Sequence, residues 1–255
     1  TVWQLENVLM YDKSIDKHSF SVLLGQSAKK SSGSYLYGSR NNITNYSRPY
    51  IDASTGLAAN ADRDAAGAPS VDATLASIFA RASYNYDERY MLQVTVRRDG
   101  SSRFGKNHRY ATFPSVSLGW RISQEAFMEK TKDVIDDLKI RAAWGQTGNQ
   151  DIENYARYSI YESKYGTGNP PTYGTSYDIT GSNGGSLLPS GFVRTQIGND
   201  DIKWETTTQT NVGMDFSLFN QTLYGSAEYY YKKTTDILIK PSYIGILGEG
   251  GGQWR

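Results

Sequence analysis

The feature that most constrains the fold is the strict alternation of apolar and polar side chains along short segments. It is clearest within residues 89–150, where 91–97 runs Met-Leu-Gln-Val-Thr-Val-Arg. Successive side chains of a β-strand point to opposite faces, so a period of two predicts a strand with one apolar face. Two more alternating segments follow in the same stretch, at 115–123 and 138–145. The stretch therefore predicts three neighbouring strands of an antiparallel sheet.

The same pattern recurs in weaker form on either side and predicts eight strands in all. The predicted strands are 3–11, 18–27, 78–86, 91–97, 115–123, 138–145, 204–218 and 222–235. Between the fifth and the sixth, QEAFMEKTKDVIDD (124–137) predicts a short helix followed by a turn. The predicted fold class is therefore all-β.

The connections between these strands alternate in length. Those after the first, third and seventh strands are short, whereas those after the second and sixth (about 27–76 and 147–201) are long, and a Gly-rich tail follows the eighth. The fourth connection is a modest loop, and the fifth is the helical one. Up-and-down antiparallel order would gather the long loops at one end and the short turns at the other. Outer-membrane barrels show this asymmetry, with long extracellular loops and short periplasmic turns.

Large aromatic residues lie near the ends of the apolar stripes. Tyr84, Tyr86 and Trp120 are predicted at the end with the short turns, and Trp144 and Trp204 at the end with the long loops. Amphipathic rings at both water interfaces form the aromatic girdles of a membrane barrel. These residues are therefore predicted membrane-interface aromatics.

The faces opposite the apolar stripes carry charged residues. They are Arg81, Arg97, Arg121, Lys139, Arg141, Glu205, Asp215 and Glu228. A water-filled lumen accommodates such charges, and so does the solvent face of a soluble sandwich. The mean hydropathy of −0.57 fits either class, because only alternate residues of a membrane strand face lipid. Loop asymmetry and aromatic positions favour the barrel, with a soluble carbohydrate-binding β-sandwich as the alternative.

Cysteine and histidine content restricts the chemistry. The chain has no cysteine and two histidines, which excludes disulfide frameworks and thiolate sites and leaves too few imidazoles for most triads. A second alternative, an outer-membrane barrel hydrolase, needs a nucleophile and a base on adjacent strand ends, and neither histidine is plainly so placed. The net charge of +1 gives no indication of a nucleic-acid partner. No catalytic residue, cofactor or metal site is predicted.

Several motifs occur in order along the chain: VTVRRDGSSRFG, FPSVSLGWRIS, DDLKIRAAWGQTGNQ, IKWETTTQTNVGMDFSLFN and AEYYYKKTTDIL. Together they resemble SusC/RagA-type TonB-dependent transporters from the outer membrane of Bacteroidota. The resemblance covers most of the chain outside the two long loops. It implies a transmembrane β-barrel of about 22 strands, a size that is plugged rather than open, to which residues 1–255 would contribute about eight strands.

The resemblance also implies the parts that surround this segment. The family's TonB box, plug domain and closing C-terminal strand have no match here, so residues 1–255 are expected to be an internal segment of one barrel domain. It implies import rather than catalysis. An oligosaccharide or a peptide would be captured at the outer face beneath a SusD/RagB-like surface lipoprotein. TonB, driven by the inner-membrane proton gradient, would then pull on the plug.

The second long loop is rich in tyrosine. Its tyrosines are Tyr155, Tyr158, Tyr161, Tyr165, Tyr173 and Tyr177. Planar rings stack on sugars or clamp peptide backbones at little entropic cost, and they also pack loops against their neighbours. Both interpretations are open at this point, and the first predicts a ligand-binding loop.

Arginines gather around the hairpin loop that is expected to face outward, at Arg98, Arg103 and Arg109. A solvated loop with Asp99-Gly100 as turn residues accounts for them. Guanidinium groups also bind phosphates in bidentate fashion, which predicts contact with lipopolysaccharide at the outer rim.

Overall fold

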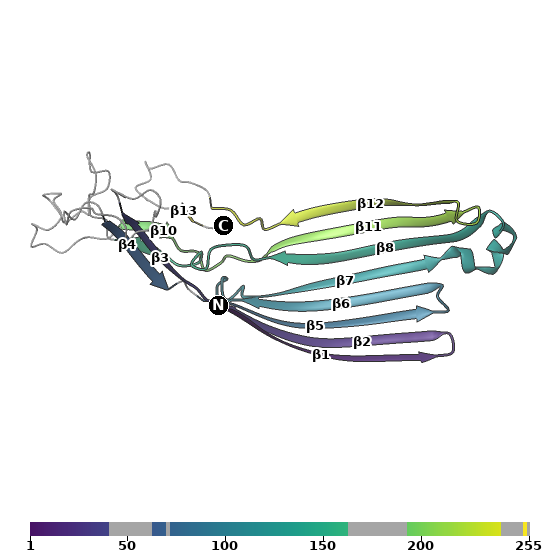
Figure 1. The fold of residues 1–255 in the computed structure, drawn as a ribbon, viewed down its shortest axis with the longest axis horizontal. Coiled ribbons are helices and arrows are strands. Elements are labelled where there is room, and N and C mark those ends of the chain that lie inside the picture. Colours follow the sequence, from purple (N-terminus) through teal and green to yellow (C-terminus); the bar gives the residue numbers. More distant parts are fainter. Residues whose placement is uncertain (41–62, 70–71, 163–192, 241–251, 254–255) are drawn as a thin grey trace, which may run out of the picture.

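The computed structural model describes residues 1–40, 63–69, 72–162, 193–240 and 252–253. Its main element is one antiparallel sheet of eight strands in the order β1-β2-β5-β6-β7-β8-β11-β12, which is curved and does not close on itself (Figure 1). The strands are β1 (Val2–Ile15), β2 (His18–Ser31), β5 (Ala73–Tyr86), β6 (Tyr90–Ser101), β7 (Tyr110–Arg121), β8 (Ile135–Asn149), β11 (Glu205–Leu218) and β12 (Leu223–Thr235). The eight predicted strands are confirmed, and most are longer than predicted. A single sheet of this kind is not the pair of facing sheets that a sandwich requires.

The alternation of connection lengths is also confirmed. Short connections join β1 to β2, β5 to β6 and β11 to β12 at one end of the sheet, here called the short-turn end, where the medium connection 122–134 also joins β7 to β8 (Figure 1). The long connections leave β2 and β8 at the opposite end, here called the long-loop end, where the modest loop 102–109 also joins β6 to β7 and the chain leaves β12 (Figure 1).

Two smaller sheets correct the prediction that the long connections carry no strands. β3 (Ser34–Arg40) and β4 (Arg63–Pro69) pair as an antiparallel hairpin between β2 and β5. β9 (Ile160–Glu162), β10 (Val193–Ile197) and β13 (Gly252–Gln253) form a three-stranded sheet. These strands lack a sustained period of two, so the pairing of distant segments, rather than local patterning, determines them.

The predicted helix at 124–137 is wrong in type and extent. The structure has two 3₁₀ helices, η2 (Ile122–Gln124) and η3 (Ala126–Thr131), and residues 135–137 already belong to β8. A 3₁₀ helix closes i to i+3 hydrogen bonds, as from the amide of Glu125 to the carbonyl of Ile122. Within the described residues, no helix is long and apolar enough to cross a bilayer.

The register sorts the side chains of the large sheet into two sets, because directly paired residues point to the same face. Ala82 pairs with Val94, Val94 with Val116, and Val116 with Trp144. These residues, and those two positions away along each strand, form the apolar face. The intervening residues form the charged face. It holds every charged residue that alternation assigned to it: Arg81, Arg97, Arg121, Lys139, Arg141, Glu205, Asp215 and Glu228.

The buried hydrophobic core lies at the long-loop end rather than against the middle of the sheet. This outer core consists of Phe104, Phe113, Ile152, Ala156, Ile202 and Trp204. Its residues come from the β6–β7 connection, the first residues of β7, and both ends of the β8–β11 connection. The Trp204 ring centroid lies 4.9 Å from that of Phe104 and 5.6 Å from that of Phe113. The outer core therefore ties the base of the longest described connection to the sheet.

Candidate functional site

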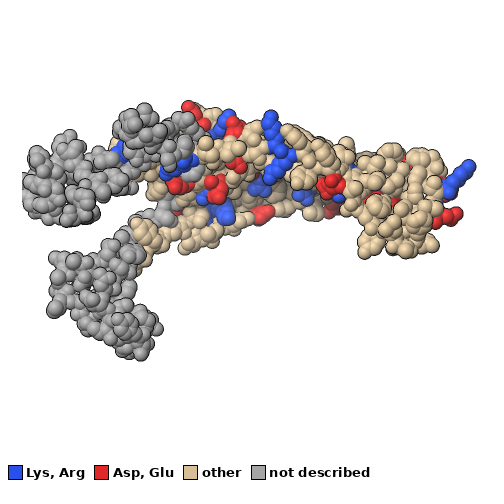
Figure 2. Space-filling model, turned by 90° about the horizontal axis from the view of Figure 1, so that it is seen from above, with Lys and Arg blue, Asp and Glu red and all other residues tan. Residues whose placement is uncertain are grey.

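The charged face carries interlinked ion pairs between strands. The Arg141 guanidinium lies 3.3 Å from a carboxylate oxygen of Asp215 and 3.2 Å from one of Glu228. The Asn211 amide also donates to Glu228, at 2.8 Å. A Cβ added to Gly213 would lie 3.0 Å from the Arg141 guanidinium carbon, so the arginine lies along the glycine backbone. In the space-filling view, basic and acidic side chains are interspersed along the molecule (Figure 2).

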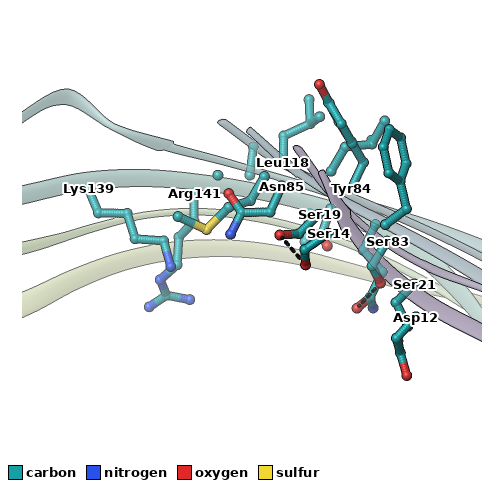
Figure 3. A pocket seen from close by; sticks show the side chains of 18 of the residues that line it. Asp12, Ser14, Ser19, Ser21, Ser83, Tyr84, Asn85, Leu118, Lys139 and Arg141 are labelled. Carbon is teal, nitrogen blue, oxygen red and sulfur yellow. Dashed lines mark hydrogen bonds between the residues drawn. The ribbon is translucent and has the colours of Figure 1, made fainter. Parts of the chain in front are cut away.

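A hollow of about 580 Å³ lies on this side of the sheet, toward its short-turn end (Figure 3). Small polar residues line it, and Lys139 and Arg141 lie together on one side of it while Asp12 lies on the other. The small polar residues are Ser14, Ser19, Ser21, Ser83, Asn85 and Ser117. Hydroxyls and amides with charges on both flanks can hydrogen-bond a polar chain.

Arg97 connects two neighbouring strands on the charged face. Its Nε donates to both carboxylate oxygens of Asp99, at 2.7 and 2.9 Å, and a terminal nitrogen donates to the Ser77 hydroxyl at 2.9 Å. Asp99 and Ser77 are buried, and the guanidinium carbon lies 5.4 Å from the centre of the Phe79 ring. These contacts join β5 to β6 near the long-loop end. They also give the buried Asp99 carboxylate the hydrogen-bond partner that a buried charge needs.

The tyrosine segment is described in part. Tyr155, Tyr158 and Tyr161 have exposed side chains, with 44%, 46% and 57% of their surface accessible. The Gln196 amide donates to the backbone oxygens of Tyr155 and Tyr158, at 2.8 and 2.9 Å, and so fixes the backbone that presents the rings. The other predicted tyrosines lie outside the described residues: Tyr165, Tyr173 and Tyr177.

The three arginines of the hairpin loop have different environments. Arg98 is exposed on the apolar face, with its guanidinium carbon 5.4 Å from the centre of the Tyr110 ring. Arg109 is partly buried, and its Nε has no hydrogen-bond partner.

Arg103 holds the hairpin loop in place through its guanidinium group, and its predicted rim contact stays a prediction. Nε donates to the Asn154 side-chain oxygen and a terminal nitrogen donates to the Gln150 carbonyl, both at 2.9 Å. The hairpin loop is thereby fastened to the start of the β8–β11 connection.

The predicted interface aromatics also differ from one another in their surroundings. Tyr84, Tyr86 and Trp120 lie on the apolar face at the short-turn end. Trp144 is the last residue of the apolar stripe of β8, because Gln146 follows it on that face and donates to the Thr208 hydroxyl.

The membrane-interface position predicted for Trp204 is wrong, since its side chain is buried and only 6% exposed. Its indole nitrogen donates to the Arg109 carbonyl at 3.1 Å. The ring belongs to the outer core and does not face lipid.

Sequence reasoning missed a carboxylate at the short-turn end. The Glu125 carboxylate accepts hydrogen bonds from the Tyr90 hydroxyl and, at 3.0 Å, from the Trp120 indole nitrogen. Arg89 lies 3.7 Å away. These contacts lower the pKa of Glu125 below its ordinary value of 4.5, with the Tyr90 hydrogen bond as the largest cause. The site depends on the pairing of Tyr90 with Trp120 across β6 and β7, which no local motif reveals.

Replacing Glu125 with Gln is expected to remove one pH-dependent part of the stability. Because the pKa of Glu125 is lowered in the folded state, its contribution is present above the ordinary pKa of 4.5 and is lost as pH falls through the lowered value. The difference in thermal midpoint between wild type and Glu125→Gln should therefore shrink as the pH falls below the ordinary pKa of 4.5 and through the lowered one. Glu129→Gln, at an exposed residue of η3, is the control and should show no such change. A pH-independent difference for Glu125→Gln would contradict the assignment.

The whole chain is similar to proteins of one family. The model of the family described as "TonB dependent receptor-like, beta-barrel" matches residues 3–251. The chain is 35% identical over 237 residues to TonB-dependent receptor P39 of Formosa agariphila, and 39% identical over 166 residues to TonB-dependent receptor SusC of Bacteroides thetaiotaomicron. These matches cover 92% and 65% of this chain, but 20% and 15% of the length of the two relatives. The chain thus spans about a fifth of their length or less.

The fold is similar to that of a solved importer. The structure of the RagAB peptide importer in the closed-closed state matches with a TM-score of 0.80 and 25% identity, over 100% of this chain and 26% of that chain. The open-open state of the same importer matches with a TM-score of 0.77. The order of the strands, the alternation of short and long connections and the family match agree. The chain therefore belongs to the TonB dependent receptor-like, beta-barrel family and is of the SusC/RagA type.

Proposed function

We propose that this segment forms part of the wall of an outer-membrane transporter that imports an oligosaccharide or a peptide by a TonB-dependent mechanism. The observation that carries the proposal is the family match over residues 3–251, together with a sheet that has one apolar and one charged face. Import by RagAB, a peptide importer of similar fold, supports it.

The two faces then have distinct environments. The apolar face contacts lipid, because only side chains without charge tolerate the hydrocarbon layer. The charged face lines the lumen, where water and polar groups solvate Arg141, Asp215 and Glu228. The long-loop end faces outward and the short-turn end faces the periplasm, as in other outer-membrane barrels.

Within such a transporter, the tyrosines at the outer end of β8 are the proposed ligand contacts of this segment. Their rings are exposed while their backbone is fixed through Gln196, so they lose little freedom on binding. The hollow on the charged face would lie along the polar path through the barrel. The plug, TonB and a SusD/RagB-like lipoprotein lid would complete the machinery.

The arrangement gives no support to a hydrolase. His18 lies at the short-turn end, where its Nδ1 is 2.8 Å from the Tyr84 hydroxyl, whereas His108 lies in the β6–β7 connection at the opposite end. Nor do the described residues contain a cluster of three His, Asp or Glu side chains that could hold a metal ion.

Alanine at Tyr155 and Tyr161 tests the binding role in the complete transporter. Each substitution is expected to weaken ligand binding about 2- to 10-fold, because a stacked ring contributes about 0.5–1.5 kcal/mol. Uptake of labelled oligosaccharide and peptide pools into cells, with and without TonB, shows which class is imported. Tyr224→Ala is the control, since Tyr224 is 78% exposed at the short-turn end. Unchanged affinity and uptake in the double variant would reject the tyrosines as contacts, and uptake without TonB would reject the mechanism.

A further inference from the structure

We propose that the outer rim of β1, β2, β5, β6 and β7 carries a binding site for a phosphorylated glycolipid of the outer leaflet, that is, lipopolysaccharide. The site lies on the apolar face of these strands, opposite the charged face, and its outer hollow is also lined by Tyr158 but not by Tyr155 or Tyr161. The proposal rests on the orientation given above, with the long-loop end outward, but it does not depend on what the transporter imports.

The site has an apolar trough whose floor is set by the register of the strands. Three small residues, Ala28, Ala76 and Gly100, lie in one paired row between Leu5 on β1 and Tyr110 on β7. A Cβ added to Gly100 would come within 2.3 Å of the Tyr110 ring, so the ring rests on the glycine.

Large side chains flank this low floor and leave a hollow of about 430 Å³, which is also lined by Ile78 and Arg98. Leu5, Ile78 and Tyr110 expose 58%, 69% and 58% of their surface. A trough of this kind accepts an acyl chain, because each buried CH₂ group gains about 0.8 kcal/mol.

A second hollow of about 380 Å³ adjoins the trough on its outer side and is basic. Tyr110, Ala28 and Ala76 line both hollows. Lys30, Arg109 and Arg157 line the outer one, and Arg98 contacts Tyr110 at the boundary. A single carboxylate, Asp72, also lines it and lies 2.6 Å from the Lys30 ammonium. Four cationic side chains against one carboxylate leave the rim positively charged.

Two of the guanidinium groups have unused donors. The Nε atoms of Arg109 and Arg157 are buried without a hydrogen-bond partner. Arg157 otherwise contacts the Tyr158 hydroxyl and lies 4.0 Å from Asp200, a carboxylate that is 81% exposed. Both arginines line the outer hollow, so the N–H groups of their guanidinium groups that face it are the proposed phosphate contacts. Guanidinium groups suit phosphate in particular, because their N–H groups match two of its oxygens.

The combination identifies the ligand class. A free phosphate would use the basic hollow and leave the trough empty, whereas a peptide would leave carbonyl and amide groups unpaired against the trough. An anionic amphiphile uses both hollows, with its phosphate at the arginines and a chain along Ala28, Ala76 and Gly100. The phosphorylated amphiphile that faces this side of an outer membrane is lipopolysaccharide. Arg98 and Arg109 thereby keep the role predicted from sequence, and Lys30 and Arg157 replace Arg103.

The test uses the complete transporter purified from outer membranes in mild detergent. Bound glycolipid is measured by native mass spectrometry for wild type, Arg109→Gln/Arg157→Gln and Ala76→Trp, each checked for its folded form by heat-dependent gel mobility. The double arginine variant removes phosphate contacts, and Ala76→Trp fills the trough while leaving every cation in place. Arg81→Gln, on the charged face, is the control for loss of charge.

Both test variants are expected to retain about 10-fold less glycolipid than wild type. Arg109→Gln/Arg157→Gln loses hydrogen bonds to a charged group, and Ala76→Trp leaves no room in the trough for an acyl chain. Arg81→Gln should retain the wild-type amount. Re-addition of purified glycolipid should restore binding to wild type, and enzymatically dephosphorylated glycolipid should bind about 10-fold more weakly. Equal retention by all folded variants, or equal binding of phosphatidylglycerol and glycolipid, would overturn the proposal. Because uptake is measured separately, wild-type protein that retains glycolipid as expected but shows no TonB-dependent import would count against the proposed function alone.

Discussion

Replacing Val94 with Arg is expected to destabilise the complete barrel by about 2–4 kcal/mol, the cost of a cationic side chain at the midplane of a membrane barrel. Val94 lies at the centre of the apolar face, paired with Ala82 on β5 and Val116 on β7. Its apolar neighbours offer no carboxylate to the new charge. The loss would be measured by urea unfolding of the protein reconstituted in liposomes.

The matched control is Gln93→Arg, one position away on the same strand. Gln93 pairs with Ser83 and Ser117 on the charged face, so a new arginine there would remain solvated. Its effect is expected to stay within about 0.5 kcal/mol, as for most exposed substitutions. Equal effects at the two positions would show that both faces contact water, and the membrane-spanning assignment would then be wrong. The pair thus tests the fold class and not merely the stability of one strand.

Replacing Trp204 with Ala is expected to cost about 3–5 kcal/mol, the range for large aromatic residues removed from a packed core. Its side chain packs between Phe104 and Phe113 and donates to the Arg109 carbonyl. The loss should be local, because the sheet itself is held by backbone pairing that Trp204 does not make. Limited proteolysis is therefore expected to cleave the β8–β11 connection while the strands stay protected.

Two further variants test whether cleavage of the connection depends on the outer core. Trp204→Phe keeps most of the ring contacts and should show intermediate protection. Trp144→Ala removes a tryptophan that is 38% exposed on the apolar face, and the connection should stay resistant to protease. If Trp204→Ala left the connection protected, or if Trp144→Ala exposed it equally, the outer core would not be what holds the connection.

Local alternation was enough to predict the strands and their faces, since a period of two is visible wherever one face is apolar and the other polar. It assigned Arg81, Arg141 and Asp215 to a common face without knowledge of the register. The resemblance of the motifs to SusC/RagA-type transporters then predicted the family, which the match over residues 3–251 confirms.

What the sequence could not supply depends on contacts between distant segments. Trp204 directly precedes a strand, and nothing near it distinguishes a ring that faces lipid from one that packs on Phe104 and Phe113. Arg103 likewise belongs to a basic cluster in sequence, yet Asn154 and Gln150 determine the direction of its side chain. Both residues lie beside the outer core or in it, where the fold is set by loop packing rather than by periodicity.

The outer core has an evolutionary consequence. Ile152 and Ala156 stand at the start of the β8–β11 connection and Ile202 and Trp204 at its end, so the core closes the connection at its base. Lengthening the segment beyond that closure costs only about 0.6 kcal/mol for each doubling. Insertions, deletions and rapid sequence drift can therefore accumulate there without disturbing the paired strands below. With Tyr155 and Tyr161 as the proposed ligand contacts, a lineage that meets a new nutrient could change its specificity in this connection while inheriting the same barrel wall.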